Sequence, residues 1–326
     1  MASFGYSLSS EEFSPCDLIA FAREAESTGF SFSLISDHFH PWTNGQSNSP
    51  FVWSVIGGLS QVTSRLVVGT GVTCPTMRIN PALVAQASAT AAAMMKGRFF
   101  LGVGTGEYLN EHIAGLRWPP PWERLEMLEE AVHVIRLLWR GGWRSHQGKY
   151  FVVQQARLFT LPDETPRIMM AASKPGAAEL AGRCADGLIS CEPDGELVKK
   201  FEESGGRHKP RYGQVTVCFD STKEKAAETV RQCWPNAGIA GDLMTDLPTP
   251  AHFDQAIKLV RPETITENMA LGPEVDDHLR AINEFIDAGF DRVYIHQVGP
   301  QQREFFRFYG DKVLPRLNGE SVERSA

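Results

Sequence analysis

The chain has 326 residues, 42% of them hydrophobic and 22% charged, a composition that can bury a large core and is unlike that of a disordered protein. Its formal net charge of −7, without a long run of Lys and Arg, offers no electrostatic footprint for nucleic acid or acidic lipid. The amino-terminal segment lacks the pattern of a secretion signal, and no apolar run is long enough to span a membrane, so we expect a cytoplasmic protein with a small-molecule partner.

Short apolar or β-branched segments recur along the chain, and many are followed by a helical pattern. The expected strands are residues 3–8, 30–36, 65–72, 98–106, 167–173, 187–191, 214–220 and 292–298, and the expected helices are residues 17–30, 80–97, 174–187 and 301–317. About eight such units in a chain of this length predict one α/β domain over residues 1–326, a TIM (β/α)8 barrel with insertions at about 39–60 and 221–270. A doubly wound open sheet is the alternative, but the glycines of GVGTGEYLNE lack the GxGxxG spacing of a dinucleotide site.

Chemically active side chains follow several of the expected strands. In SDHFHPW, Asp37, His38 and Trp42 come directly after the second strand, while Glu11 and Glu107 follow the first and fourth. Barrel active sites lie at the carboxyl ends of the strands, so we expect these residues at the mouth. A carboxylate beside His38 can orient one ring nitrogen and leave the other as a general base. Asp37 precedes His38 and points to the opposite face of the strand, where it can serve the backbone instead.

Glu107 is the expected second proton-handling group, because a carboxyl group that loses water in a barrel mouth has a raised pKa and can carry a proton at neutral pH. Trp42, Trp53 and Phe51 could form an apolar wall for a planar ring or an aliphatic substrate. Trp53 and Phe51 fit equally well in an aromatic cluster under a long loop.

The sequence offers two further candidate sites, one for a metal ion and one for a phosphate. His38 and His40 have the spacing of metal ligands on one strand, as in metal-dependent hydrolase barrels, but His296 is the one further ligand candidate, and the six cysteines lack CxxC spacing, so we expect no metal. The segment MMAASKPGAAELAG opens a helix near Pro175, where exposed N–H groups can hold a phosphate, or where Ser173 can simply cap the helix.

Four segments together resemble the luciferase-like family of flavin and deazaflavin oxidoreductases: SDHFHPW, TCPTMRINPALVAQASAT, GVGTGEYLNE and AASKPGAAELAGRCADGL. Within the family, the chain most resembles the branch that contains F420-dependent glucose-6-phosphate dehydrogenase and F420-dependent secondary alcohol dehydrogenase. The resemblance runs over nearly the whole chain and is densest between residues 1 and 190. The resemblance implies a TIM barrel, usually a homodimer, that binds coenzyme F420 with its deazaflavin ring in the mouth. It also implies a role for each matched residue. His38 is the base on the substrate hydroxyl, Trp42 lines the substrate side, Glu107 lies by N1 of the deazaflavin, and Glu11 is the glutamate of the first-strand loop.

The same resemblance implies a set of cofactor-contacting positions: Asp37, Thr105 and Asn110, a non-prolyl cis peptide near Gly71 and Val72, and a loop of Ala172, Ser173 and Lys174 that holds the F420 phosphate. The implied reaction is hydride transfer between the deazaflavin and an alcohol, a carbonyl compound or an activated alkene. Asp194 and Glu267 stand about where the glucose-6-phosphate dehydrogenases have lysines, so we expect a substrate other than glucose 6-phosphate.

Two alternatives remain within this resemblance. Glu111 and His112 follow a pattern found in a side group proposed to use FMN, which would make the chain an FMN-dependent reductase or monooxygenase. A barrel that only binds or stores the cofactor is the other alternative, but the presence of both His38 and Glu107 argues against it, because storage needs no proton-transfer pair.

Overall fold

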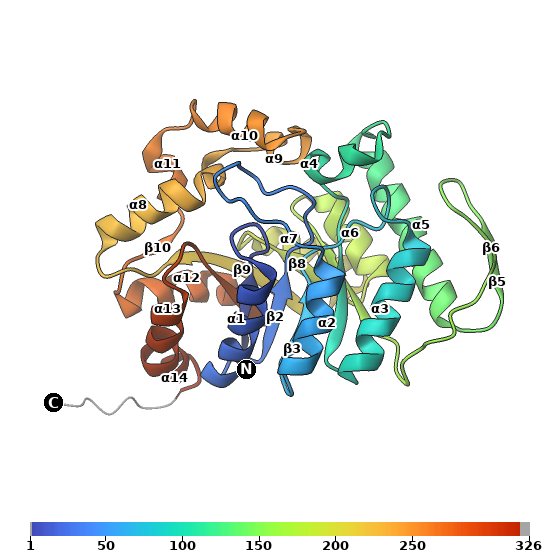
Figure 1. Cartoon of the computed structure of the whole chain (residues 1–326), viewed down its shortest axis with the longest axis horizontal. Helices are drawn as coiled ribbons and strands as arrows, with labels where there is room; N and C mark the ends of the chain where they lie inside the picture. The colour runs from blue at the N-terminus through green and yellow to red at the C-terminus, as the bar shows by residue number, and fades with distance from the viewer. Residues whose placement is uncertain (1, 320–326) are drawn as a thin grey trace.

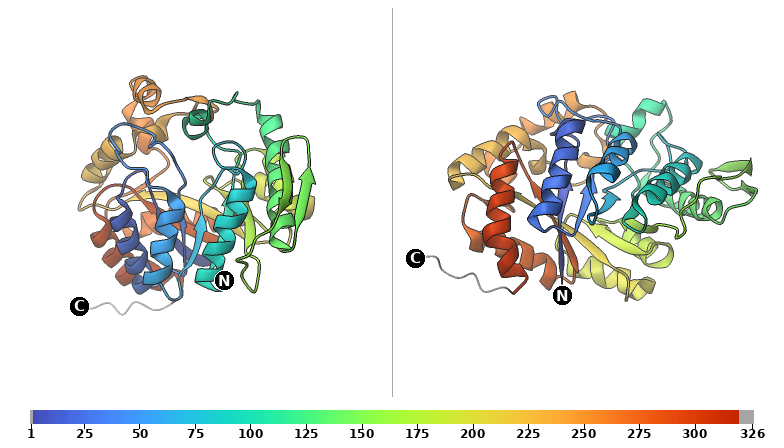
Figure 2. Two further views of the ribbon diagram at one scale, coloured as in Figure 1. Left: turned by 45° about the vertical axis from the view of Figure 1, so that its right-hand side comes forward. Right: turned by 60° about the horizontal axis from the view of Figure 1, so that its bottom comes forward.

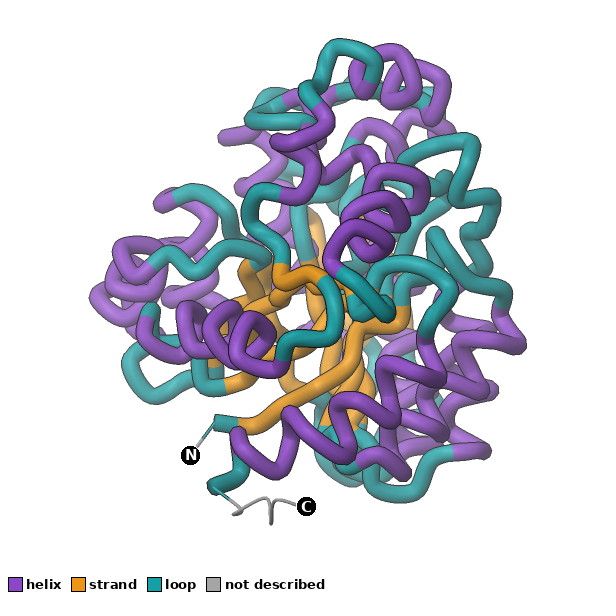
Figure 3. Tube along the Cα trace, turned by 90° about the vertical axis from the view of Figure 1, so that its left-hand side faces the viewer, coloured by secondary structure: helices purple, strands orange, loops and turns teal. Residues whose placement is uncertain are grey.

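The computed structural model describes residues 2–319, in which eight parallel strands close into a barrel (Figure 1, Figure 3). In order around the barrel the strands are β1 (Ser3–Leu8), β2 (Phe32–Ile35), β3 (Val67–Thr70), β4 (Phe99–Val103), β7 (Arg167–Ala171), β8 (Gly187–Ser190), β9 (Arg211–Cys218) and β11 (Arg292–Gln297). Pairing of β11 with β1, in the register Ser3 to Arg292, closes the circle. The predicted TIM (β/α)8 barrel is confirmed, and the open sheet is excluded.

Helices surround the strands on the outside (Figure 2). They are α1 (Pro15–Thr28), α2 (Val52–Val62), α3 (Pro81–Met95), α5 (Pro121–Trp139), α6 (Pro175–Cys184), α7 (Gly195–Phe201), α12 (Val275–Asp287) and α13 (Gln302–Phe308), with the short α4 (Tyr108–Glu111) and α14 (Leu314–Leu317). Local sequence sets several ends: the side chain of Asn80 accepts from the N–H of Ala82 at the start of α3, and Gly29, at φ 108°, ends α1.

Side chains alternate between the two faces of each strand, and the two faces contribute to two separate hydrophobic cores. One face packs outward against the helices, as Val293 and Ile295 of β11 do. The other face fills the barrel with a layer that includes Phe32, Phe100 and Tyr294. Inner-face residues beyond this layer, toward the carboxyl ends of the strands, therefore face the mouth.

The segment between β9 and α12 is mostly helical and lies over the mouth (Figure 1, top). It comprises α8 (Lys223–Cys233), α9 (Leu243–Asp246), α10 (Pro250–Ile257), α11 (Pro262–Thr266) and β10 (Ala270–Leu271), which pairs with β9. Three contacts fasten it to the barrel loops. Lys174 pairs with Asp242, Trp118 Nε1 donates to Asp246 over 2.9 Å, and Nδ2 of Asn44 donates to Asp254 over 2.6 Å. Asp246 belongs to α9 and Asp254 to α10.

Several features differ from the sequence expectation, which gave no helix for α5, α7 or α12. The excursion expected at residues 39–60 is shorter, because α2 begins at Val52 and repeats buried apolar residues at helical spacing through Leu59. The hairpin of β5 (Arg144–Gln147) and β6 (Val152–Ala156) was not expected and projects from the side of the barrel (Figure 1, right). Within residues 2–319, no helix combines the length and apolar character needed to cross a lipid bilayer.

Candidate active site

A cavity of about 330 Å³ lies at the carboxyl ends of the strands. Its wall includes the predicted residues Glu11, His38, Trp42, Gly71, Val72, Thr105, Glu107, Ala172 and Ser173, and also Glu192, Trp234, Tyr294 and His296. The structure therefore brings together nine of the predicted site residues. Asp37, Asn110 and Lys174 are not part of the wall.

Glu11 and His38 form a buried pair in this cavity. Oε1 of Glu11 lies 3.3 Å from Nε2 of His38, and Oε2 accepts from the hydroxyl of Ser36 over 2.6 Å. Nδ1 of His38 bonds the carbonyl oxygen of His40 over 3.2 Å, whereas the contact of Nε2 with Glu11 lacks hydrogen-bond geometry, so we assign the proton of the neutral ring to Nδ1, because a carbonyl only accepts. Nε2 is then the nitrogen that can take up a proton, with the Glu11 carboxylate beside it to stabilise the imidazolium.

Trp42 provides the expected aromatic wall, whereas Trp53 and Phe51 do not. The Trp42 indole lies edge-on to His38, with ring centroids 4.8 Å apart, and packs against Phe253 of α10 on its other side. Phe51 is exposed, and Trp53 packs near Phe99 on the outside of the barrel. Of the two alternatives left open for Phe51 and Trp53, the wall at the mouth is excluded, because Phe51 caps α2 and Trp53 lies in its first turn, and neither lines the cavity.

Glu107 lines the cavity at the amino end of α4, and Asn110 supports the surrounding loops. Nδ2 of Asn110 donates to the Glu107 carboxylate over 3.1 Å. Its Oδ1 accepts from the backbone N–H groups of Phe39 and His40, at 2.9 and 3.1 Å. Asn110 thus ties the fourth-strand loop to the second-strand loop, although it does not itself line the cavity.

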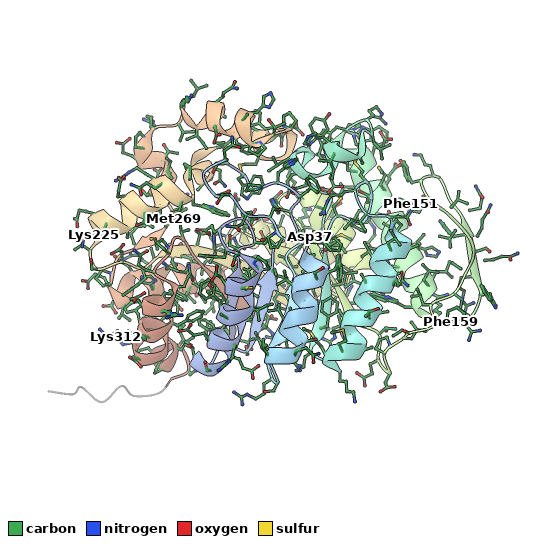
Figure 4. The ribbon with its side chains drawn as sticks, viewed as in Figure 1. Asp37, Phe151, Phe159, Lys225, Met269 and Lys312 are labelled. Atoms are coloured by element: carbon green, nitrogen blue, oxygen red, sulfur yellow. The ribbon has the colours of Figure 1, made fainter. Side chains whose placement is uncertain are left out.

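Asp37 lies inside the protein at the upper end of the barrel (Figure 4) and belongs to a buried charge network. It accepts from the hydroxyl of Thr73 over 2.7 Å and from the guanidinium of Arg78 over 2.9 Å. The backbone N–H of Arg78 donates to Glu111 over 2.7 Å. Asp37 therefore braces the second-strand and third-strand loops and does not line the cavity, where the resemblance placed it as a cofactor contact. Sequence reasoning missed Arg78, which follows the third strand in TCPTMRIN.

Burial raises the pKa of Glu111 to about 7, and Glu107 and Asp37 nearby act in the same direction. The backbone N–H and the guanidinium of Arg78 oppose this rise. A buried carboxyl group that exchanges its proton near neutral pH therefore lies directly behind the Glu107 loop.

Backbone with small side chains forms one side of the cavity. The peptide bond between Gly71 and Val72 is cis, at the position that the resemblance implied. A Cβ on Gly104 would lie 2.7 Å from Val72, and one on Gly106 would lie 2.7 Å from the sulfur of Cys74. This side has no room for larger residues and presents a surface against which a flat ring can lie.

The loop before α6 contributes only part of what was expected. Ala172 and Ser173 line the cavity, but the Lys174 side chain is exposed and paired with Asp242 of the insertion. The residue that caps α6 is Lys174, without a side-chain hydrogen bond, so the interpretation of Ser173 as the helix cap is wrong. Ser173 lies instead in the wall of the cavity, two residues beyond the end of β7 at Ala171.

His38 and His40 do not share a ligand site. The His40 ring bonds the carbonyl oxygen of Leu109 over 2.9 Å and stacks on His112, while the His38 ring lies between Glu11 and Trp42. Across residues 2–319, no group of three or more His, Cys, Asp or Glu side chains is arranged to hold a metal ion. The strand β2 ends at Ile35, so neither histidine lies on it and the spacing of ligands on one strand does not apply.

The charge of the wall is acidic. Glu11, Glu107 and Glu192 line the cavity, and in the described part of the chain no Lys or Arg does. Asp194, which was expected to face the substrate, caps α7 through the N–H groups of Glu196 and Leu197. Glu192, two positions earlier, is the acidic residue that lines the cavity in this loop. Alternation of side chains along β8 predicts that Ile189 and Cys191 face the inside of the barrel, but it does not predict the direction of Glu192, which lies beyond the strand.

Comparison with known proteins identifies the family. The family model described as luciferase-like monooxygenase matches residues 2–292. The chain belongs to the luciferase-like monooxygenase family. Two curated members similar to this luciferase-like chain are F420-dependent glucose-6-phosphate dehydrogenases, from Microbacterium testaceum at 33% identity and from Mycobacterium avium at 32%; both alignments cover 96% of this chain and 97% of the relative.

Solved structures of the luciferase-like fold agree. An F420-dependent secondary alcohol dehydrogenase, determined in complex with an F420-acetone adduct, superposes with a TM-score of 0.89 at 30% identity, covering 96% of this chain and 98% of that one. The F420-dependent tetrahydromethanopterin reductase from Methanopyrus kandleri has a TM-score of 0.76 at 22% identity, covering 97% and 99%, which supports the fold alone.

Proposed function

We propose that this protein is an F420-dependent oxidoreductase that oxidises an uncharged alcohol or, in reverse, reduces the carbonyl compound. The observation that carries the proposal is the buried Glu11–His38 pair in the cavity at the barrel mouth. The same cavity has a wall of small residues and a second carboxylate, Glu107. The similarity to F420-dependent dehydrogenases over nearly the whole chain supports the cofactor.

The residues present fit a deazaflavin. The wall of Gly71, Val72 and Gly104 would accept one face of a planar ring, because neither glycine has a side chain that could project into the cavity. Thr105 and Glu107 would hold the ring edge, and Ala172 and Ser173 would hold the phosphate-bearing tail through the loop before α6. Bound there, coenzyme F420 supplies the hydride acceptor or donor.

The chain's own residues handle the proton. Nε2 of His38 takes the hydroxyl proton of the substrate, and Glu11 stabilises the imidazolium that results. Trp42 excludes water from one side of the ring of His38. Glu107 is held by Asn110, so its carboxyl group keeps one orientation at the cofactor edge.

The charges favour an uncharged substrate over a sugar phosphate. Even at ~10 Å and an effective dielectric constant of about 20, one carboxylate repels a dianion by roughly 3 kcal/mol. Three carboxylates, Glu11, Glu107 and Glu192, line the cavity and would each repel a sugar phosphate.

A neighbouring cavity of about 630 Å³, which shares Cys191, Glu192 and Gln214 with the first, does not supply a cation for a phosphate either. Among its described lining residues the only Lys or Arg is Arg280, which already donates to Asp277 over 2.6 Å.

The test is an assay of F420 reduction with a panel of uncharged secondary alcohols and with glucose 6-phosphate. We expect turnover with at least one uncharged alcohol and a kcat/KM for glucose 6-phosphate at least about tenfold lower. His38→Ala should retain F420 binding and lose about 100-fold or more in kcat, the usual contribution of a general base. A preference for glucose 6-phosphate would refute the substrate class, and an undiminished rate in His38→Ala would remove His38 from the mechanism.

A further inference from the structure

A second histidine–glutamate pair lies in the same barrel mouth. His296, near the end of β11, is 2% exposed, and its Nε2 lies 2.9 Å from Oε2 of Glu12. The other oxygen of Glu12 accepts from the backbone N–H of Gly299 over 2.9 Å, so the carboxylate is held at both ends. Because an ionised carboxylate only accepts, Nε2 of His296 carries the proton, and the neutral ring has its lone pair at Nδ1.

That Nδ1 is buried and has no hydrogen-bond partner among the described residues. His296 shares the inner face of β11 with Tyr294, and both line the cavity. The indole of Trp234, from the insertion, lies edge-on to the His296 ring with centroids 4.5 Å apart. A buried polar atom without a partner costs about 1–3 kcal/mol, so a ligand that supplies the missing donor recovers this free energy on binding.

Resting on the proposed function, we propose that Nδ1 of His296 accepts a hydrogen bond from a second hydroxyl group of the substrate, separate from the hydroxyl that His38 deprotonates. The substrate is then an uncharged compound with at least two hydroxyl groups, not a simple alcohol. The two pairs divide the work: His38 uses Nδ1 for a backbone carbonyl and offers Nε2, whereas His296 uses Nε2 for Glu12 and offers Nδ1. Glu12 is a positioning residue that acts through His296.

The test compares ligands that differ by one donor. Cyclohexanol, the cyclohexane-1,2-, -1,3- and -1,4-diols and their monomethyl ethers are titrated into the protein, with and without F420, and followed by tryptophan fluorescence, since Trp42 and Trp234 line the cavity. We expect the best diol to bind about 10–100-fold more tightly than cyclohexanol, the equivalent of one recovered buried hydrogen bond. Its methyl ether, which lacks the donor, should lose this gain.

Variants assign the preference to His296. His296→Phe should abolish the preference for the diol, and His296→Asn, which keeps a side-chain acceptor, should retain part of it. His146→Gln is the matched control, because His146 forms a similar pair with Glu130 at 3.0 Å on the outer hairpin, and it should leave the preference unchanged. Should His296→Phe fail to fold, Glu12→Gln provides the second test, with a preference reduced by roughly threefold or more.

Three results would overturn the inference: no preference in the wild-type protein, including no measurable binding of either ligand; a preference that survives in His296→Phe; or an equal loss in His146→Gln. F420 binding is recorded on the same samples. Failure to bind F420 with an intact diol preference would sink the proposed function alone, whereas F420 binding without a diol preference would sink the hydroxyl site alone.

Discussion

At the scale of single residues, three carboxyl groups near the mouth do different work because their neighbours differ. Glu11 accepts from serine hydroxyls and faces His38. Glu107 is held by an amide. Glu111 is buried behind both loops, with Arg78 as its principal donor, and its pKa is raised to about 7. Its folded-state proton affinity therefore exceeds that of the unfolded chain.

This difference predicts a dependence of stability on pH. Between pH 4.5 and about 7 the native state holds a proton on Glu111 that the unfolded chain releases, so the stabilisation is present at low pH and is lost as pH rises through 7. The loss amounts to at most about 3 kcal/mol. Glu111→Gln should flatten this part of the profile, measured by urea unfolding from pH 5 to pH 8. The control is Glu196→Gln on an exposed carboxylate; parallel profiles for wild type and Glu111→Gln would contradict the assignment.

At the scale of elements, the loop from β4 to α4 positions the Glu107 carboxylate through its glycines. Gly106 has φ +79°, and a Cβ there would lie 2.7 Å from Cys74 and 2.9 Å from Glu111. The loop can pass between the third-strand loop and α4 only without a side chain at this position. Glu107 is the next residue, so any shift at Gly106 moves it.

Gly106→Ala should therefore destabilise the fold by about 2–4 kcal/mol, combining left-handed backbone strain with a steric clash. Gly115→Ala is the matched control, because Gly115 has φ +69° and open space around its Cβ position. It should cost only about 1 kcal/mol. Urea unfolding measures both. Equal losses in the two variants would show that packing at Gly106 contributes nothing beyond strain.

The elements that sequence alone could predict were those with strong periodicity and clear caps, such as β4 and α3. It missed α2, because Pro, Asn and Trp near its start resemble a loop, and it missed the β5–β6 hairpin, whose short strands are only half-buried. His38 and Glu11 were predictable from their place after strands. The Glu12–His296 pair was not, because its two members are 284 residues apart and meet only when β11 closes against β1.

At the scale of the whole molecule, the projecting hairpin bears on assembly. Trp143 and Phe159 flank it and contact each other edge-on, with centroids 6.3 Å apart, and they are 65% and 77% exposed. Phe159 is seen at the outer edge in Figure 4. Large exposed aromatic side chains of this kind are typical of protein interfaces.

The expected homodimer supplies a prediction for this surface. The purified protein should have twice the monomer mass by light scattering after gel filtration, and the double variant Trp143→Ser, Phe159→Ser should shift toward the monomer. Leu259→Ser, at an exposed leucine on the insertion, is the control and should stay dimeric. A wild-type monomer would contradict the homodimer, and a dimeric double variant would place its interface elsewhere.

The central claim is that the barrel mouth is built for coenzyme F420, and titration of the purified apo-protein with F420 and, separately, with FMN tests it most directly. Ring fluorescence follows binding in both titrations. We predict saturable binding of F420 at one per chain and binding of FMN at least about 100-fold weaker, a difference of about 3 kcal/mol. Tighter binding of FMN would move the protein to the flavin-dependent members of the fold, and binding of neither cofactor would contradict the account.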